Sequence, residues 1–434
     1  MKKTFQISLA LVGTLLFSCN QAEDLQLPVE ENMPDSKIQW VLDLAQSEAE
    51  RLFPPQGRAD VRVAKVSGLK AVCDNNSRGE SDTLIYVVNY EDNKGFALIS
   101  ATGAEQPVLA VVPEGNYDPA VGTDNPGFNL FMAAARNNAK SDSLKKEITP
   151  AGYPMNIYGQ YVKTEEKVIT QYGPVKRINY CHKWGPGDVF GQYCPNQNAG
   201  CVAVTALSVV SYIFKDDTTR VEYTYPGADI NSEYIDWGEL RRHQCSSATY
   251  NDGTTIEHTC WAKDKEAIHK SIGRICRQFG YDANASYNKI PATTVVAPSR
   301  IPALLRKHLP DCTVTEFADF VAFRTMRCID KGLIFLSGNL KYSPYTNHTW
   351  FTDGYDYSKI EVKEYVAYPP APGLNYAWIL NKTYYKERMY NFMRWGWNGE
   401  YDGWYSGTEL DPERSGNPIA NIRYIYVSLL SEYL

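Results

Sequence analysis

The sequence lacks the spacing of a structural zinc site, because none of its ten cysteines form a C-x-x-C pair. Basic clusters are also absent, and the 44 Lys and Arg are outnumbered by 50 Asp and Glu, for a net charge of −6. This balance argues against nucleic-acid binding. Histidine is scarce, with six in 434 residues, so a catalytic histidine has few competitors. We find no internal repeat and no low-complexity tract.

What is present is the composition of a globular protein, 44% hydrophobic and 22% charged, with 31 tyrosines. The chain is too long for one small domain. Two domains, or one large domain behind a prosegment, are therefore expected.

The N-terminus predicts export. Lys2 and Lys3 precede an apolar run over 7–17 that is too short to remain as a membrane span. The run ends at Cys19 in a pattern that resembles a bacterial lipobox, so we expect 1–19 to be a lipoprotein signal peptide with Cys19 lipidated. The acidic segment 20–35 reads as a linker. An ordinary signal peptide with an incidental Cys19 is the alternative.

These features predict a location in the bacterial cell envelope, lipid-anchored on the periplasmic or outer surface, or secretion after processing. No later segment has the pattern of a transmembrane helix.

The next segment predicts a small α+β module. Ser36 is a candidate cap for an amphipathic helix that Pro54 stops. Strands over 84–90 and 95–100 are joined by a turn-rich loop typical of a hairpin, and a third strand covers 108–112. By itself the module contains no plausible pair of nucleophile and base.

The boundary between the two domains falls in the mixed stretch around the charged residues 141–147. We assign 36–150 to the first module and 165–434 to a second domain, in which helices alternate with strands.

Cys201 is the candidate nucleophile. Gly200 precedes it, and a small and apolar run to Ile213 predicts a buried helix that starts at the cysteine. A helix N-terminus offers unpaired N–H groups and a partial positive charge, which lower a thiol pKa and can hold an oxyanion. The alternative is an inert cysteine packed like a small hydrophobe.

His348 is the candidate base. It precedes an alternating, aromatic-rich strand and follows Cys201 by 147 residues, within the range between nucleophile and base in papain-type enzymes. A surface histidine on a strand is the alternative. His269 and His308 lie in helix-like stretches, and His182, in a loop, is the second choice.

A third segment, 393–404, contains Trp-Gly-Trp before a glycine-rich turn. Indoles are large, rigid groups that can shield a Cys–His ion pair from water. Tryptophans that only pack a hairpin are the compatible alternative.

Together these segments resemble the streptopain family of cysteine peptidases, a branch of the papain-like clan. The Gly-Cys-Val-Ala block at 200–203, the histidine block at 347–355 and the Trp-Gly-Trp block at 395–399 carry the resemblance, with Trp184-Gly185-Pro186-Gly187 upstream. The module at 36–150 resembles the inhibitory prodomain of these enzymes through its strand segments. The resemblance implies an α+β papain-like catalytic domain behind a small α+β prodomain.

Two departures from the family pattern concern the site. Pro186 stands where the family usually has Gln, a donor near the oxyanion, and Gln192 is a candidate substitute. Arg394 stands where the family usually has Asn, and it would disfavour an imidazolium unless it pointed away. The resemblance implies that Trp395 orients His348. Two further positions differ, since Asn347 and Asn398 replace family glycines.

The expected function is that of a cysteine endopeptidase made as a zymogen, which acts on protein or peptide substrates and is inhibited by its own prodomain. The Cys201 main-chain N–H would help to hold the oxyanion. The chemistry needs no metal and no organic cofactor. One alternative is a catalytically impaired homologue that acts as a surface binding or inhibitory protein. Another is wall-peptide amidase or transglutaminase chemistry.

Overall fold

The computed structural model describes residues 35–53, 65–73, 83–102, 106–143, 160–176, 183–243, 247–249, 255–257, 264–289, 292–317, 321–341, 343–367, 377–411 and 419–429. Residues 1–34, with Cys19, the predicted signal peptide and all of the predicted linker except Asp35, lie outside the described residues, as does His182.

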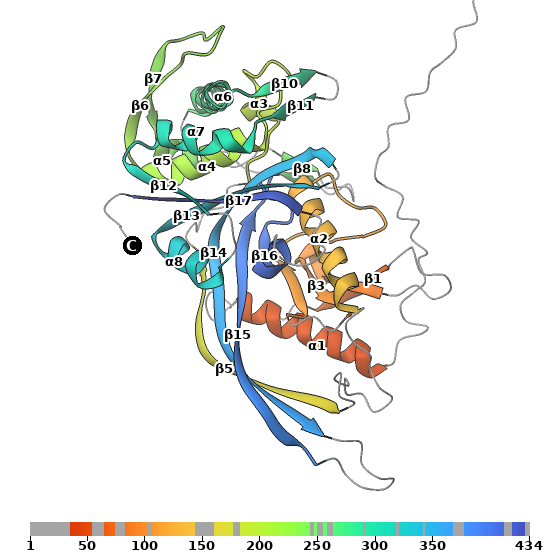
Figure 1. Cartoon of the computed structure of the whole chain (residues 1–434). Coiled ribbons are helices and arrows are strands. Elements are labelled where there is room, and N and C mark those ends of the chain that lie inside the picture. The colour runs from red at the N-terminus through yellow and green to blue at the C-terminus, as the bar shows by residue number, and fades with distance from the viewer. Residues whose placement is uncertain are drawn as a thin grey trace, which may run out of the picture.

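The N-terminal module is a four-stranded antiparallel sheet with one helix on each face (Figure 1). Its elements are α1 (Asp35–Leu52), β1 (Val66–Cys73), β2 (Thr83–Tyr90), β3 (Phe96–Ser100), β4 (Val108–Val112) and α2 (Pro126–Ser143). Alternate residues of β2 face opposite cores: Tyr86 and Val88 contact the α1 side, while Ile85 and Val87 contact the α2 side. The predicted helix, hairpin and third strand are confirmed, but α1 begins at Asp35, so Ser36 lies inside the helix and does not cap it.

A helical lobe forms the top of the molecule in Figure 1 and surrounds α4 (Cys201–Phe214). The predicted buried helix that starts at Cys201 is confirmed. The other helices and short hairpin strands of this part are α3 (Asp188–Gly191), β6 (Thr218–Glu222), β7 (Ser232–Asp236), α5 (Trp237–Arg241), β8 (Ser247–Thr249), β9 (Thr255–Glu257), α6 (Lys265–Asp282), β10 (Ser286–Lys289), β11 (Ala292–Val295) and α7 (Ile301–His308).

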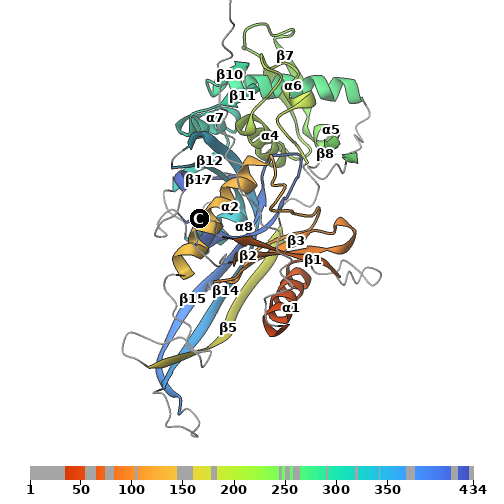
Figure 2. The same ribbon diagram turned by 90° about the vertical axis from the view of Figure 1, so that its right-hand side faces the viewer.

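The second half of the chain builds an antiparallel sheet in the order β12-β17-β13-β14-β15-β16, with β5 also paired to β14. Its elements are β5 (Tyr161–Lys176), β12 (Cys312–Phe317), α8 (Ala322–Lys331), β13 (Gly332–Leu340), β14 (Ser343–Ala367), β15 (Ile379–Arg394), β16 (Gly403–Ser406) and β17 (Ile419–Leu429). The far ends of β5, β14 and β15 extend from the body as a curved arm (Figures 1 and 2).

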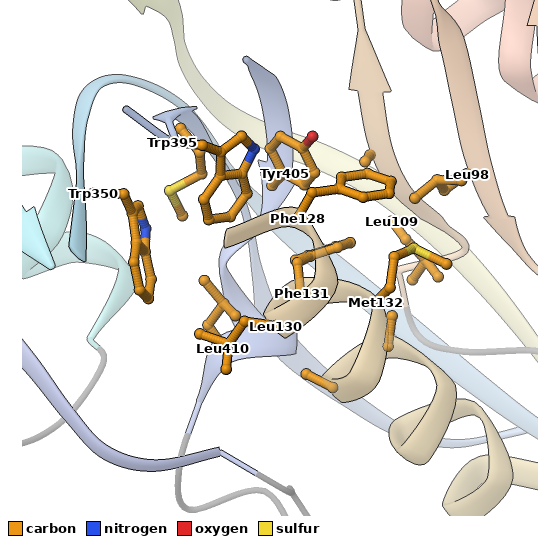
Figure 3. Packing of buried hydrophobic residues seen from close by; sticks show 14 of the residues in the cluster. Leu98, Leu109, Phe128, Leu130, Phe131, Met132, Trp350, Trp395, Tyr405 and Leu410 are labelled. Carbon is orange, nitrogen blue, oxygen red and sulfur yellow. The ribbon is translucent and has the colours of Figure 1, made fainter. Parts of the chain in front are cut away.

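The two parts share one sheet and one core. Strand β4 of the N-terminal module pairs with β16, where Val111 lies opposite Trp404. Figure 3 shows Phe128 of α2 between Leu98 of the module and Tyr405 of the larger part, with Phe131 below them. The Phe131 and Tyr405 ring centroids are 4.7 Å apart, a normal distance for an edge-to-face pair.

The predicted α+β class is confirmed. No helix among the described residues is both long enough and apolar enough to cross a membrane.

Candidate active site

Cys201 is the first residue of α4. The turn before it needs a glycine, since Gly200 has φ +81° and a Cβ there would lie 2.9 Å from the Thr294 side chain. Asn198 Oδ1 accepts the Gly200 N–H at 2.9 Å, which closes the turn. The helix behind Cys201 is buried from Val202 to Ser211. Cys201 therefore stands on a rigid element at the edge of this buried stretch, where the residue keeps some exposed surface although its thiol is largely desolvated.

Helix α4 packs against the strand that carries His348. The Thr205 hydroxyl, one turn after Cys201, donates to the Thr349 carbonyl at 3.2 Å. The Thr349 main chain and hydroxyl also provide hydrogen bonds that favour the Cys201 thiolate. The fold thus brings together two segments that lie 147 residues apart in the sequence.

His348 lies in β14 opposite Gly338 of β13 and is 1% exposed. Its Nε2–H donates to the Trp395 carbonyl at 2.7 Å, which leaves Nδ1 as the nitrogen with a free electron pair. The Trp397 ring lies edge-on to the imidazole, with centroids 6.4 Å apart. Burial lowers the pKa of His348 to about 4.

Trp395 contacts His348 through its main chain and is itself fixed at two points. Its indole N–H donates to the Tyr401 carbonyl at 3.0 Å, and its main-chain N–H donates to Asp402 Oδ1 at 2.9 Å. Burial raises the pKa of Asp402 to about 7, against the opposing charge of Arg394. Sequence reasoning assigned no role to Asp402, because its link to His348 runs through another residue's peptide group.

Arg394 points away from the imidazole and pairs with Asp353. Its guanidinium donates Nε–H to Oδ1 at 3.0 Å and an Nη2 hydrogen to Oδ2 at 3.2 Å, and both side chains are buried. A bidentate pair of this kind compensates each buried charge. The unfavourable contact between Arg394 and an imidazolium, expected unless the arginine turned away, is therefore avoided.

The N-terminal module covers the histidine. A Cβ added to Gly127, the second residue of α2, would lie 2.4 Å from Trp395 Cε3 and 2.8 Å from His348 Cδ2. Asn125 holds this approach, because its amide donates to the Glu400 carbonyl at 2.7 Å while its Oδ1 accepts the Gly127 N–H at 3.0 Å. Thr123 donates to the Glu400 carboxylate at 2.7 Å.

A second anchor joins the module to the larger part. Arg51 at the end of α1 donates to Asp356 Oδ2 at 2.6 Å. The module is thus attached both at the histidine and at the base of the β14–β15 ribbon.

Within the described residues no hydrogen bond joins Cys201 to His348. Burial raises the pKa of the Cys201 thiol, and the Thr349 hydrogen bonds only partly oppose this. With the pKa of His348 lowered as well, both groups are neutral near pH 7. The helix N-terminus was expected to lower the thiol pKa, but in the covered site desolvation is the larger effect.

The other predicted site residues lie elsewhere or outside the described chain. Gln192 is exposed, and its Cβ would lie 3.4 Å from a Cβ at Gly273 of α6; its oxyanion role stays a prediction. Cys312 and Cys328 are both free thiols. Among the described residues no three His, Cys, Asp or Glu side chains are arranged to bind a metal ion.

Residues 45–139 match the family model of the Spi protease inhibitor. This match lies inside the 36–150 module and confirms the predicted streptopain-type inhibitory prodomain. No curated protein matches the sequence.

Two solved structures are similar to the chain. One is prointerpain A of Prevotella intermedia, as a cysteine-to-alanine mutant, with 16% identity over 82% of this chain and 97% of that one and a TM-score of 0.47. The other is active wild-type interpain A cysteine protease of the same organism, with 15% identity over 60% and 95% and a TM-score of 0.35. Both scores are below 0.5, so no conclusion about this chain follows from them.

Proposed function

We propose, from the Spi-type inhibitor module in front of a Cys201–His348 site, that this chain is a cysteine endopeptidase made as a zymogen. One observation carries the proposal: Gly127 of the inhibitor module packs against the imidazole on the strand beside Cys201. An inhibitor held against a histidine next to a helix-start cysteine is the arrangement that a latent thiol peptidase needs.

In the proposed reaction the module leaves the site, and Cys201 and His348 are exposed to water and to each other. Release from burial lets the thiol pKa fall and the imidazole pKa rise, which favours the thiolate–imidazolium pair. The thiolate then attacks a peptide carbonyl carbon, so that an S–C bond forms and the carbonyl electrons move to oxygen. The Cys201 N–H stabilises this oxyanion.

His348 next donates its Nδ1 proton to the leaving amine as the C–N bond breaks and a thioester forms. Water, deprotonated by the same nitrogen, hydrolyses the thioester. The hydrogen bond from Nε2–H to the Trp395 carbonyl keeps Nδ1 in the role of acceptor. Trp395 is on this account the orienting residue, acting through its main chain.

The test is a side-by-side purification of wild type and Cys201→Ala. The wild type should cut the connection between its module and the larger part, and the variant should stay full length. Self-processing by Cys201→Ala in a protease-free preparation would rule out Cys201 as the nucleophile.

A catalytically impaired homologue that acts as a surface binding or inhibitory protein is the second candidate. The departures at Pro186 and Arg394 are the features that would favour it. The Arg394 guanidinium is paired with Asp353, so Pro186 is the departure that still favours this candidate. Failure of an electrophilic probe to label Cys201 in the processed protein would support this candidate. Cleavage of wall peptides but not of proteins would instead indicate amidase or transglutaminase chemistry.

We also propose that Cys19 is lipidated and anchors the protein in the bacterial envelope. The support is the apolar run that ends at Cys19. Cys19→Ser should move the protein from the membrane fraction to the soluble exported fraction, measured by fractionation and immunoblot. Unchanged membrane association would exclude the lipid anchor.

A further inference from the structure

Two departures from the streptopain pattern meet in space. Pro186 replaces the glutamine whose side chain is a donor near the oxyanion, and Asn398 replaces a glycine more than 200 residues later. The Asn398 N–H donates to the Trp184 carbonyl at 3.0 Å, two residues before Pro186. The proline at 186 removes a side-chain N–H donor from this position, and the asparagine at 398 introduces one beside it.

The Asn398 amide lies directly over Gly185. A Cβ at Gly185 would be 2.0 Å from Asn398 Oδ1 and 2.9 Å from Nδ2, so only glycine leaves room for the amide. Residues 184–187 in turn run beside the stretch that leads to the nucleophile, because the Pro186 carbonyl accepts the Ala199 N–H at 2.7 Å. The Asn398 amide thus lies against Gly185, the residue before Pro186, and the 184–187 segment that it covers is hydrogen-bonded to the stretch before Cys201.

The position also adjoins the histidine. Trp397, the residue before Asn398, has its ring beside His348, and a Cβ at Gly396 would be 3.3 Å from Thr205 Oγ1 on α4. The loop 395–398 therefore passes both catalytic elements. Asn398 is partly exposed, as a group that meets substrate must be.

The backbone explains why asparagine can occupy this place. Asn398 has φ +56°, and asparagine is one of the few residues with a side chain that accept this region readily. A glycine-to-asparagine replacement keeps the turn and adds an amide donor. Gln192, the other candidate, is exposed and lies near Gly273 of α6.

We propose that Asn398 is the side-chain oxyanion donor of this enzyme and takes the role of the glutamine that Pro186 replaces. The inference rests on the proposed peptidase function. As Cys201 attacks, the carbonyl oxygen gains the electron pair of its π bond, and Asn398 Nδ2–H donates to it together with the Cys201 N–H. Loss of one such donor typically costs about 10²–10³ in kcat.

The test uses the processed enzyme and three variants. Asn398→Gly keeps the left-handed backbone and removes the amide. Pro186→Gln with Asn398→Gly restores the family arrangement. Asn284→Gly is the matched control, because Asn284 is exposed and also has positive φ (+55°) at the end of α6.

Three measurements are made on each variant: kcat and KM on a peptide substrate, the rate of Cys201 alkylation by iodoacetamide, and the inhibition constant of a peptide aldehyde. Alkylation places no oxygen in the oxyanion position, whereas the aldehyde forms a neutral hemithioacetal whose hydroxyl lies there. We expect Asn398→Gly to lower kcat by about 10²–10³ and to weaken the aldehyde by a smaller factor, because the adduct carries no full negative charge, with alkylation unchanged. The double variant should recover at least about tenfold of the loss, and Asn284→Gly should match wild type.

Two results overturn the inference. If wild type cleaves peptide and Asn398→Gly keeps kcat within about threefold, Asn398 is not an oxyanion donor and the proposed function stands. If wild type neither cleaves peptide nor reacts with iodoacetamide at Cys201, the proposed function is wrong and the inference falls with it.

Discussion

Gly127→Ala should loosen the hold of the inhibitor module. The added methyl would lie 2.4 Å from Trp395 Cε3 and 2.8 Å from His348 Cδ2. Both neighbours are at most 1% exposed, and Trp395 is fixed by hydrogen bonds at its main chain and indole. Neither can yield easily, so the overpacking cost is about 1–3 kcal/mol.

Helix propensity acts against this steric cost and favours the covered state of Gly127→Ala. Gly127 is in the first turn of α2, and alanine favours a helix over glycine by about 0.5–1 kcal/mol. With a steric cost of about 2 kcal/mol, the middle of that range, the net destabilisation of the covered state is about 1–1.5 kcal/mol, which corresponds to roughly 5- to 13-fold weaker coverage of the site. If helix propensity dominated instead, Cys201 in the variant precursor would be alkylated more slowly than in the wild-type precursor.

The assay is the initial rate of Cys201 alkylation in the intact precursor, followed by mass spectrometry before self-processing begins. The rate should rise by the factor given above. Gly68→Ala is the matched control, since a Cβ at Gly68 in β1 of the same module meets nothing within 4 Å. An alkylation rate for Gly127→Ala equal to or slower than that of the control would refute the autoinhibitory contact.

Two further predictions concern pH. In the processed enzyme, Cys201 alkylation should stay fast at mildly acidic pH. In His348→Ala this fast alkylation at acidic pH should be lost, which leaves a thiol that titrates near its usual pKa of about 8.5. Loss of the fast acidic alkylation in His182→Ala instead would identify His182 as the base. His243 is 1% exposed, and burial lowers its pKa to about 4. As the pH falls, His243 therefore binds a proton in the unfolded state before it does so in the folded state. Its contribution should lower the free energy of unfolding of the precursor by roughly 2–3 kcal/mol from pH 6.5 to 4. His348, buried with the same lowered pKa, adds a similar decline, so His243→Phe should remove about half of the total in urea unfolding, and an unchanged slope would exclude His243 as a source.

The sequence predicted the elements that carry their own pattern. The buried helix at Cys201 follows a glycine and a long apolar run, and the strand at His348 shows aromatic alternation. Helix α2 was not predicted, although it supplies Gly127. Its apolar residues face a core shared by the two parts. Some of the residues that this helix packs against are therefore distant in the sequence, and the local pattern does not reveal them.

The remaining site features depend on contacts across the fold. Arg394 and Asp353 pair across neighbouring strands, and nothing in either segment alone indicates the partner. The raised pKa of Cys201 likewise arises from burial. The helix-dipole argument from the sequence considers only the charge at the helix N-terminus and omits the desolvation of the thiol. Segment patterns thus predicted the candidate reacting groups, while the direction of their pKa shifts depends on the packed structure.

The pairing of β4 with β16 also affects how the protein is made. About 290 residues separate Val111 from Trp404, so this pairing cannot form until nearly all of the chain has been synthesised. Contacts of such long sequence separation form slowly. The pairing that completes the sheet therefore also links folding to the covering of the candidate site. The N-terminal module reaches His348 only as the last strands arrive, so the partly made chain has neither this contact nor a complete candidate site.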